Sequence, residues 1–152
     1  MYHREMQTNS LFRDPVLLLP TELVSQIFNW LDIMEVCTCR LVSTRWNRSS
    51  VMNIKNRKEL NFANYRPIIS DNGLNAILKM TRHLTVVRLD ECWKCATEDN
   101  LVLLSKNCPK LRVLSASRCK WVTDHAIRIL CERCKGLEEL DFSSCYQVSV
   151  IE

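Results

Sequence analysis

The sequence predicts an α/β protein in which a short helical module precedes an array of strand–turn–helix units. Two observations lead to this prediction: apolar residues recur at helical spacing between residues 19 and 46, and the second half of the chain repeats itself. The 152 residues, 47% apolar and 25% charged, are enough to bury a core and have the composition of an ordinary globular protein.

The repeat is carried by four positions in each unit. In order they are Leu84, Val87, Leu89 and Cys92, then Leu111, Leu114, Ala116 and Cys119, then Leu137, Leu140, Phe142 and Cys145. The copies are 27 and then 26 residues apart, counted from 84 to 111 and from 111 to 137. The alternation predicts a short strand in each copy, and the apolar residues between copies predict helices that begin near Asp71, near Glu98 or Asp99, and near Asp124. A partial earlier copy contains Leu60 and Phe62.

This pattern resembles the cysteine-containing leucine-rich repeat. The resemblance is clearest from Cys108 to Leu114, at Cys119, and from Val122 to Ile127. It implies a right-handed solenoid with parallel strands on its concave face and helices on its convex face, in about three and a half units. The sequence departs from the family at Thr81, which stands where the repeat has cysteine, and at Ala116, where leucine is usual.

The nine cysteines have two interpretations. The pairs Cys92/Cys95 and Cys131/Cys134 have a spacing that is compatible with a zinc site, as in a zinc-dependent nucleic-acid binder. However, Cys92, Cys119 and Cys145 recur at one position of the repeat and Cys108 and Cys134 at another, so within the two pairs only Cys95 and Cys131 have no counterpart. We therefore favour buried structural thiols, and we expect no metal and no cofactor.

The N-terminal module is predicted to contain three short helices. Pro20 is suited to the first turn of a helix that carries Ile27 and Phe28. A second apolar segment runs from Ile33 through Val36 to Leu41 and Val42, and the Ser43 hydroxyl is placed to cap a third helix that carries Trp46. So small a module makes a poor isolated core, so we expect the repeats or a partner to cover part of its apolar surface.

This module resembles the F-box. The pattern of that family is Leu-Pro-x-Glu-Leu, then Ile-Phe, a leucine, and later Arg-x-Val-Cys-x-x-Trp. The matching positions are Leu19, Pro20, Glu22, Leu23, Ile27, Phe28, Leu31, Arg40, Val42 and Trp46. Ser43 replaces the frequent cysteine, and Glu35-Val36 replaces a frequent Asp-Leu. The alternative is a helical cap that only shields the first repeat.

An F-box followed directly by such repeats resembles the substrate receptors of SCF-type cullin-RING ubiquitin ligases. The resemblance implies a non-catalytic adaptor. Its F-box would bind a Skp-type linker subunit, and through it the cullin and RING subunits, while the repeats hold a target protein for ubiquitination and proteasomal degradation. None of His3, His83 and His125 has the partners of an acid–base catalyst. A repeat scaffold without any ligase connection is the alternative.

Candidate linker-binding residues come from the helical stripe and its support. They are Leu19, Pro20, Leu23, Ile27, Phe28, Leu31, Leu41, Val42 and Trp46. Leu41, Val42 and Trp46 are equally compatible with packing inside the module.

Candidate target-binding residues are the outward positions of the strands, with aromatic residues next to the repeated cysteines. They are Val86, Arg88, Asp90, Trp93, Val113, Ser115, Ser117, Trp121, Glu139, Asp141 and Ser143, together with Tyr146. The aromatic side chains could form a binding rim or could shield the edges of the repeats.

The chain is predicted to divide into an N-terminal tail (1–14), the F-box module (15–56) and the repeats (57–152). The formal charge of +4 is scattered and the longest early apolar run, Val16 to Leu19, is short, so we expect neither a nucleic-acid nor a membrane partner. Without an export signal, we expect the chain in the cytoplasm, the nucleus or both. Because the sequence stops where the helix after Cys145 should begin, we expect a C-terminally truncated array with an uncapped end.

Overall fold

The computed structural model describes residues 18–65 and 69–149. The predicted tail, residues 1–14, and the last three positions, 150–152, lie outside the described residues. None of the helices in the described part of the chain combines the length and the apolar character that a membrane crossing needs.

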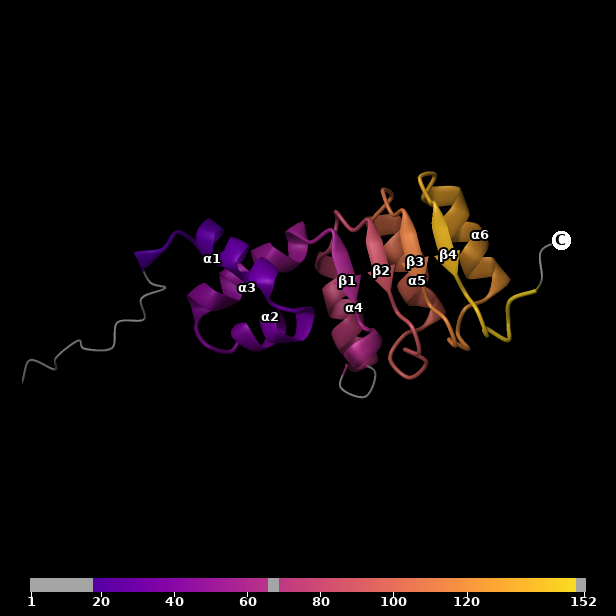
Figure 1. The fold of residues 1–152 in the computed structure, drawn as a ribbon, viewed down its shortest axis with the longest axis horizontal. Coiled ribbons are helices and arrows are strands. Elements are labelled where there is room, and N and C mark those ends of the chain that lie inside the picture. Colours follow the sequence, from indigo (N-terminus) through magenta and orange to yellow (C-terminus); the bar gives the residue numbers. More distant parts are fainter. Residues whose placement is uncertain (1–17, 66–68, 150–152) are drawn as a thin grey trace, which may run out of the picture.

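The N-terminal module consists of helices, as predicted. They are α1 (Thr21–Ile27), the 3₁₀-helix η2 (Phe28–Trp30), α2 (Ile33–Cys39) and α3 (Thr44–Asn56). Asp32 caps α2 by accepting hydrogen bonds from the backbone N–H groups of Met34 and Glu35, both at 2.8 Å. The Ser43 hydroxyl accepts from Trp46 N at 3.2 Å and caps α3, which confirms the predicted cap. Helices α1 and α2 both pack against α3 (Figure 1).

The second apolar segment ends earlier than the sequence predicted. Helix α2 stops at Cys39, and Leu41 and Val42 lie in the turn that follows. The backbone N–H groups of Leu41 and Val42 bond three residues back, to Thr38 O and Cys39 O, and this tightened turn ends the helix. The turn carries both apolar side chains to the surface.

The second half of the chain forms a parallel sheet in the order β1-β2-β3-β4. Its strands are β1 (Glu59–Asn61), β2 (Val86–Arg88), β3 (Val113–Ser115) and β4 (Glu139–Asp141), and the connecting elements are η3 (Ala63–Tyr65), α4 (Asp71–Met80), α5 (Glu98–Asn107) and α6 (Asp124–Arg133). The helices begin at Asp71, Glu98 and Asp124, so the acidic residues lie in the first turns as predicted, each helix behind a Ser or Thr N-cap. The described part of the chain thus contains six α-helices and a four-stranded parallel sheet, as the predicted α/β class required.

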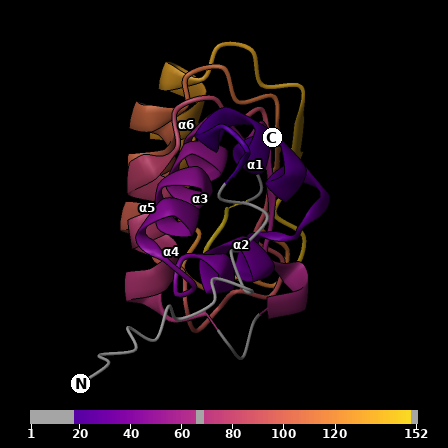
Figure 2. The same ribbon diagram turned by 90° about the vertical axis from the view of Figure 1, so that its left-hand side faces the viewer.

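The pairing register of the strands follows the sequence repeat. Leu60 is paired with Val87, Val87 with Leu114, and Leu114 with Leu140. Helices α4, α5 and α6 stack behind one face of the sheet, and the other face has no helix over it (Figures 1 and 2). The buried apolar side chains form one cluster that extends from Val24 in α1 to Cys145 beyond β4. The helical module therefore shares a continuous core with the sheet.

Arg57 stabilises the end of α3, where the helical module meets the first strand. Its guanidinium donates to the carbonyls of Phe28 (3.1 Å) and Leu31 (2.6 Å) and to Asn53 Oδ1 (2.8 Å). Burial lowers the pKa of Arg57, although Asp32 opposes that shift. These bonds satisfy the Leu31 carbonyl and give a second donor to Phe28 O, which also accepts from Leu31 N at 3.1 Å.

A second polar contact joins the two parts of the chain. Tyr65 in η3 hydrogen-bonds Asp32, the N-cap of α2, and this bond raises the pKa of Tyr65 to about 12. Together with Arg57, it ties the helical module to the first strand and its following turn.

Candidate docking surfaces of the helices and the sheet

Helix α1 and the first residue of η2 carry two apolar stripes. Val24 and Phe28, four residues apart, point into the core and are 1% and 3% exposed. Leu23 and Ile27, also four residues apart, remain 44% and 50% exposed. Because a helix that only packs on its own core needs one apolar stripe, the second stripe is available to another protein.

The exposed apolar surface continues beyond α1. Of the nine large apolar side chains that are exposed in the described residues, six belong to the helical module: Leu18, Leu23, Ile27, Trp30, Leu41 and Val42. We call these six residues the apolar face. Leu18 and Trp30 are not among the predicted linker-binding residues, although Trp30 follows Ile27 by three residues and its helical spacing was a usable signal. Trp30 is 92% exposed, which makes it the most exposed member.

Several predicted linker-binding residues lie beneath this surface instead. Phe28 is buried and packs against Trp46, with ring centroids 5.4 Å apart, so the prediction that Phe28 lies on the docking surface needs correction. Trp46, Leu19 and Leu31 are half-buried and pack on the core. Pro20 is exposed at the N-cap of α1.

A buried polar network supports the apolar face from below. The Asn53 side chain, 1% exposed, donates to Ser25 O (2.9 Å) and Asn29 Oδ1 (2.7 Å) and accepts from Arg57. Ser49 Oγ donates to Thr21 O at 3.3 Å. These bonds fix α1 on α3, so the outer stripe of α1 is presented by a rigid element. The sequence patterns gave no signal for this network, because its members are scattered polar residues.

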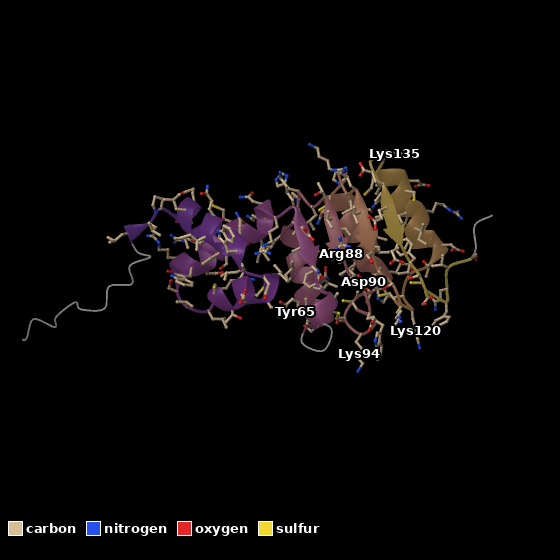
Figure 3. All side chains as sticks on the ribbon, viewed as in Figure 1. Tyr65, Arg88, Asp90, Lys94, Lys120 and Lys135 are labelled. Carbon is tan, nitrogen blue, oxygen red and sulfur yellow. The ribbon has the colours of Figure 1, made fainter. Side chains whose placement is uncertain are left out.

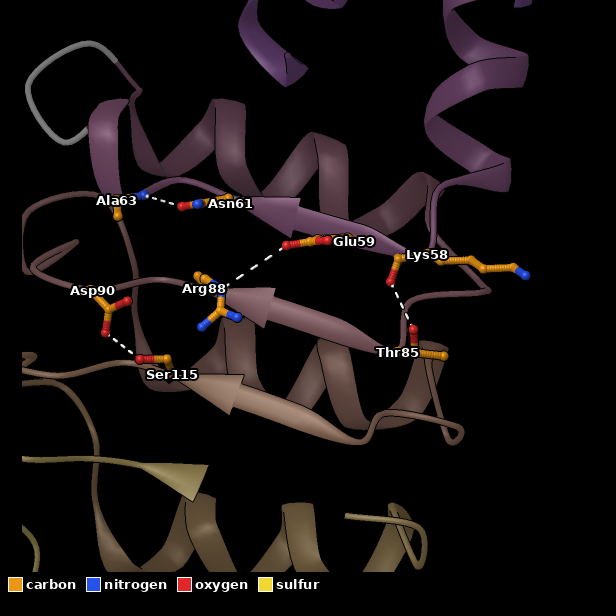
Figure 4. A network of polar contacts seen from close by, with 8 residues as sticks. All are labelled: Lys58, Glu59, Asn61, Ala63, Thr85, Arg88, Asp90 and Ser115. Atoms are coloured by element: carbon orange, nitrogen blue, oxygen red, sulfur yellow. Dashed lines mark hydrogen bonds and ion pairs between the residues drawn. The ribbon is translucent and has the colours of Figure 1, made fainter. Parts of the chain in front are cut away.

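Polar side chains on the open face of the sheet and at the strand starts make contacts between neighbouring strands. Arg88 on β2 lies 4.0 Å from the carboxylate of Glu59 on β1, and Thr85 Oγ1 donates to Lys58 O at 3.1 Å (Figure 4). Val86 and Val113, both predicted to face outward, are half-buried on the same face.

Asp90 organises the loops that follow β2 and β3. Its Oδ1 accepts from the hydroxyls of Ser115 and Ser117 and from Ser117 N, with the last two bonds at 2.8 and 2.9 Å (Figure 4 shows the Ser115 bond). Burial alone would raise the pKa of Asp90, but the hydrogen bonds from the two serines lower it overall. Ser115 is only 7% exposed, so this predicted target-binding residue is a structural partner of Asp90 and offers little surface of its own.

The last strand has the most exposed predicted positions. Glu139 and Ser143 are exposed, and Asp141 is half-buried and accepts from Ser143 N at 2.9 Å. Leu140, which faces the core side of the sheet, is 38% exposed, and its equivalents Val87 and Leu114 are fully buried.

The predicted aromatic rim divides into two kinds of residue. Trp93 and Tyr146 are 53% and 82% exposed. Trp121 is half-buried, and its Nε1 donates to Cys92 O at 3.2 Å, so it shields the neighbouring unit.

Three repeated cysteines, Cys92, Cys119 and Cys145, form a buried row in the loops that follow β2, β3 and β4, and we call them the ladder cysteines. The Cys119 thiol donates to Leu89 O and the Cys145 thiol to Ala116 O, both at 3.2 Å, and Cys92 contacts Phe62 O in the same way. Burial raises the pKa of Cys119 to about 12, which keeps its thiol protonated and able to donate. Each thiol thus links one unit to the unit before it.

Cys95 also has a structural place that sequence comparison missed. Its backbone N–H bonds to Cys92 O just as those of Val122 and Val148 bond to the next two ladder cysteines, so Cys95 occupies a core position filled by valine elsewhere. Among the described residues, no group of three or more His, Cys, Asp or Glu side chains is placed to hold a metal ion. His3 lies outside the described residues.

Comparison with known proteins agrees with the geometry of the helical module. Residues 16–58 match the F-box domain family. Among solved structures, the chain is similar to one chain of a yeast complex of Rad7 and Elc1, with a TM-score of 0.51 and 19% identity, a likeness that concerns the fold alone. The match covers 84% of this chain and 34% of that chain, so this chain spans about a third of the length of the protein that it resembles. The helices that present the apolar face therefore lie within the segment, residues 16–58, that matches the F-box domain family.

Proposed function

We propose that this chain is a substrate-recognition adaptor of an SCF-type ubiquitin ligase. Its F-box docks a Skp-type linker, which brings the cullin and RING subunits, and its sheet and loops bind a target protein for ubiquitination and proteasomal degradation. The adaptor works in the cytoplasm, the nucleus or both. The observation that carries the proposal is the second, exposed apolar stripe of α1, which no residue of this chain covers in the described structure.

The adaptor contributes no catalytic group of its own. Its contribution is proximity: holding a target lysine beside a ubiquitin thioester converts an encounter into an effectively intramolecular step. Such a role requires two separate binding surfaces on a rigid body. The shared core and the Arg57 bonds support that requirement, because they tie the helical module to the sheet.

We further propose that residues 57–152 form a cysteine-containing leucine-rich-repeat solenoid. The parallel register that advances by one repeat per strand supports this assignment, and so do the thiol bonds between successive units. In this arrangement the open face of the sheet is the concave face, available to a target protein.

Co-purification with a Skp-type linker tests the ligase connection. Replacing both Leu23 and Ile27 by Asp places two charges on the exposed stripe, and we expect linker recovery to fall at least about tenfold. The matched control is Tyr146→Asp, which changes an exposed apolar side chain at the other end of the molecule and should leave recovery unchanged. Unchanged thermal unfolding of both variants would show that folding is intact.

Equal recovery of the native chain and the double variant would contradict the ligase connection. A repeat scaffold without ligase partners, the alternative function, would then be favoured. Phe28 is unsuitable for this test because a charge at a buried position would unfold the module.

A further inference from the structure

The loops that follow β2, β3 and β4 line a hollow of about 480 Å³ beyond the carboxyl ends of these strands, along one edge of the sheet. Each loop contributes two residues, one just before and one just after its ladder cysteine. The lining residues are Glu91 and Trp93, Arg118 and Lys120, and Ser144 and Tyr146. We call this hollow the loop groove.

The backbone fixes the lining positions in the same way in all three loops. Glu91, Arg118 and Ser144 have φ angles of 58°, 57° and 60°, in the left-handed region that residues other than glycine rarely adopt. Adjacent loops are also bonded, because Glu91 N donates to Ser117 O and Arg118 N to Ser143 O, at 2.9 and 2.8 Å. The fold therefore imposes the unusual backbone angle, and the side chains that line the groove are attached to a rigid backbone.

The groove combines aromatic walls with unbalanced positive charge. Arg118 lies 3.4 Å from the Glu91 carboxylate, so these two charges largely offset each other. Lys120 stands between Trp93 and Tyr146 in the order of the loops, and no carboxylate of the described residues lies within 4.0 Å of its ammonium group. Lys94 lies over the Trp93 ring, 4.7 Å from its centroid. Lys94 and Lys120 project at the same edge of the sheet, opposite Lys135 (Figure 3).

We infer that the loop groove binds an acidic segment of the target protein, with an Asp or Glu side chain at Lys120 and neighbouring apolar side chains against Trp93 and Tyr146. This inference rests on the proposed function, because it names the chemistry of the target. A carboxylate matches the positive charge of Lys120, which no carboxylate of the described residues offsets, and exposed aromatic rings bury apolar neighbours with little loss of side-chain freedom. A nucleic acid fits less well, since its affinity depends on several phosphate contacts, and the groove is lined by only two basic residues, of which Arg118 is already paired with Glu91.

Binding to synthetic peptides tests the inference. The purified full chain is passed over immobilised peptides of random sequence whose central residue is fixed as Glu, Gln or phosphoserine. We expect the Glu peptides to retain about fivefold more protein than the Gln peptides. Lys120→Glu should remove this preference, whereas Lys135→Glu, the same charge change at the opposite edge of the sheet, should preserve it.

Trp93→Ala provides a second variant that leaves the charge unchanged. It should lower retention on the Glu peptides several-fold without abolishing the preference for Glu over Gln. Equal retention of Glu and Gln peptides by the native chain would overturn the inference, as would a stronger preference for phosphoserine or for an immobilised oligothymidine strand. Linker recovery is measured on the same samples: normal linker binding with no peptide preference rejects only this inference, whereas lost linker binding rejects the proposed function.

Discussion

The two ends of the molecule present opposite kinds of surface. The helical module exposes uncharged apolar side chains, six of the nine that are exposed in the described structure. The open face of the sheet exposes polar groups that already pair with each other, as Arg88 does with Glu59. An apolar surface favours a permanent partner, because it is costly to leave in water. A polar surface favours selective recognition, because mismatched polar groups are penalised.

Within the helical module, the largest difference in contribution to stability is expected between Phe28 and Trp30, two aromatic residues in the same 3₁₀-helix. Phe28→Ala should lower the free energy of unfolding by about 3–5 kcal/mol, since it leaves a cavity beside Trp46. Trp30→Ala should change it by less than about 0.5 kcal/mol, because the side chain is 92% exposed. Urea unfolding measures both. Similar losses in the two variants would mean that Trp30 packs in the core and does not belong to the apolar face.

Loss of the Arg57 hydrogen bonds is expected to have the next largest effect on the free energy of unfolding. Arg57→Ala removes the guanidinium donor to Leu31 O and to Asn53 Oδ1 and one of the two donors to Phe28 O, so we expect the free energy of unfolding to fall by about 2–4 kcal/mol. Lys55→Ala, an exposed change in the last turn of the same helix, is the matched control and should be nearly neutral. Equal stability of the two variants would argue against a rigid link between the two surfaces.

The smallest effect is expected on the sheet side, at Asp90. Because its pKa is lower in the folded chain, its carboxylate stabilises the fold above the ordinary pKa, about 3.9, and this contribution disappears as the pH falls through the lowered folded value. Asp90→Asn should therefore cost under about 1 kcal/mol at neutral pH. The difference in the free energy of unfolding between this variant and the native chain should shrink as the pH is lowered. Urea unfolding at several pH values measures it. A difference that grew in acid would contradict the assigned hydrogen bonds.

Much of the fold could be predicted from the sequence because the repeat fixes it locally. The alternation around Leu60, Val87 and Leu114 determined the strands, and the acidic residues at the helix starts determined where the helices begin. Ser43 could be identified as a cap because a hydroxyl just before a helix has one common use.

The surfaces were harder to predict, because exposure depends on tertiary packing. A motif match does not separate Phe28, which faces the core, from Ile27 beside it, which faces solvent. Leu41 and Val42 have the apolar character of a helix interior, but a tightened turn brings them to the surface. The loop groove could not be anticipated either, since it depends on left-handed backbone angles at residues whose side chains give no sign of them.

Hydrogen exchange of the full chain with and without a Skp-type linker tests the separation of the two surfaces most directly. We predict slower amide exchange in α1, in η2 and in the turn between α2 and α3, with unchanged exchange in the loops that follow β2, β3 and β4. Slowed exchange in those loops, or none in the helical module, would contradict the assignment of the apolar face to the linker and of the sheet edge to the target.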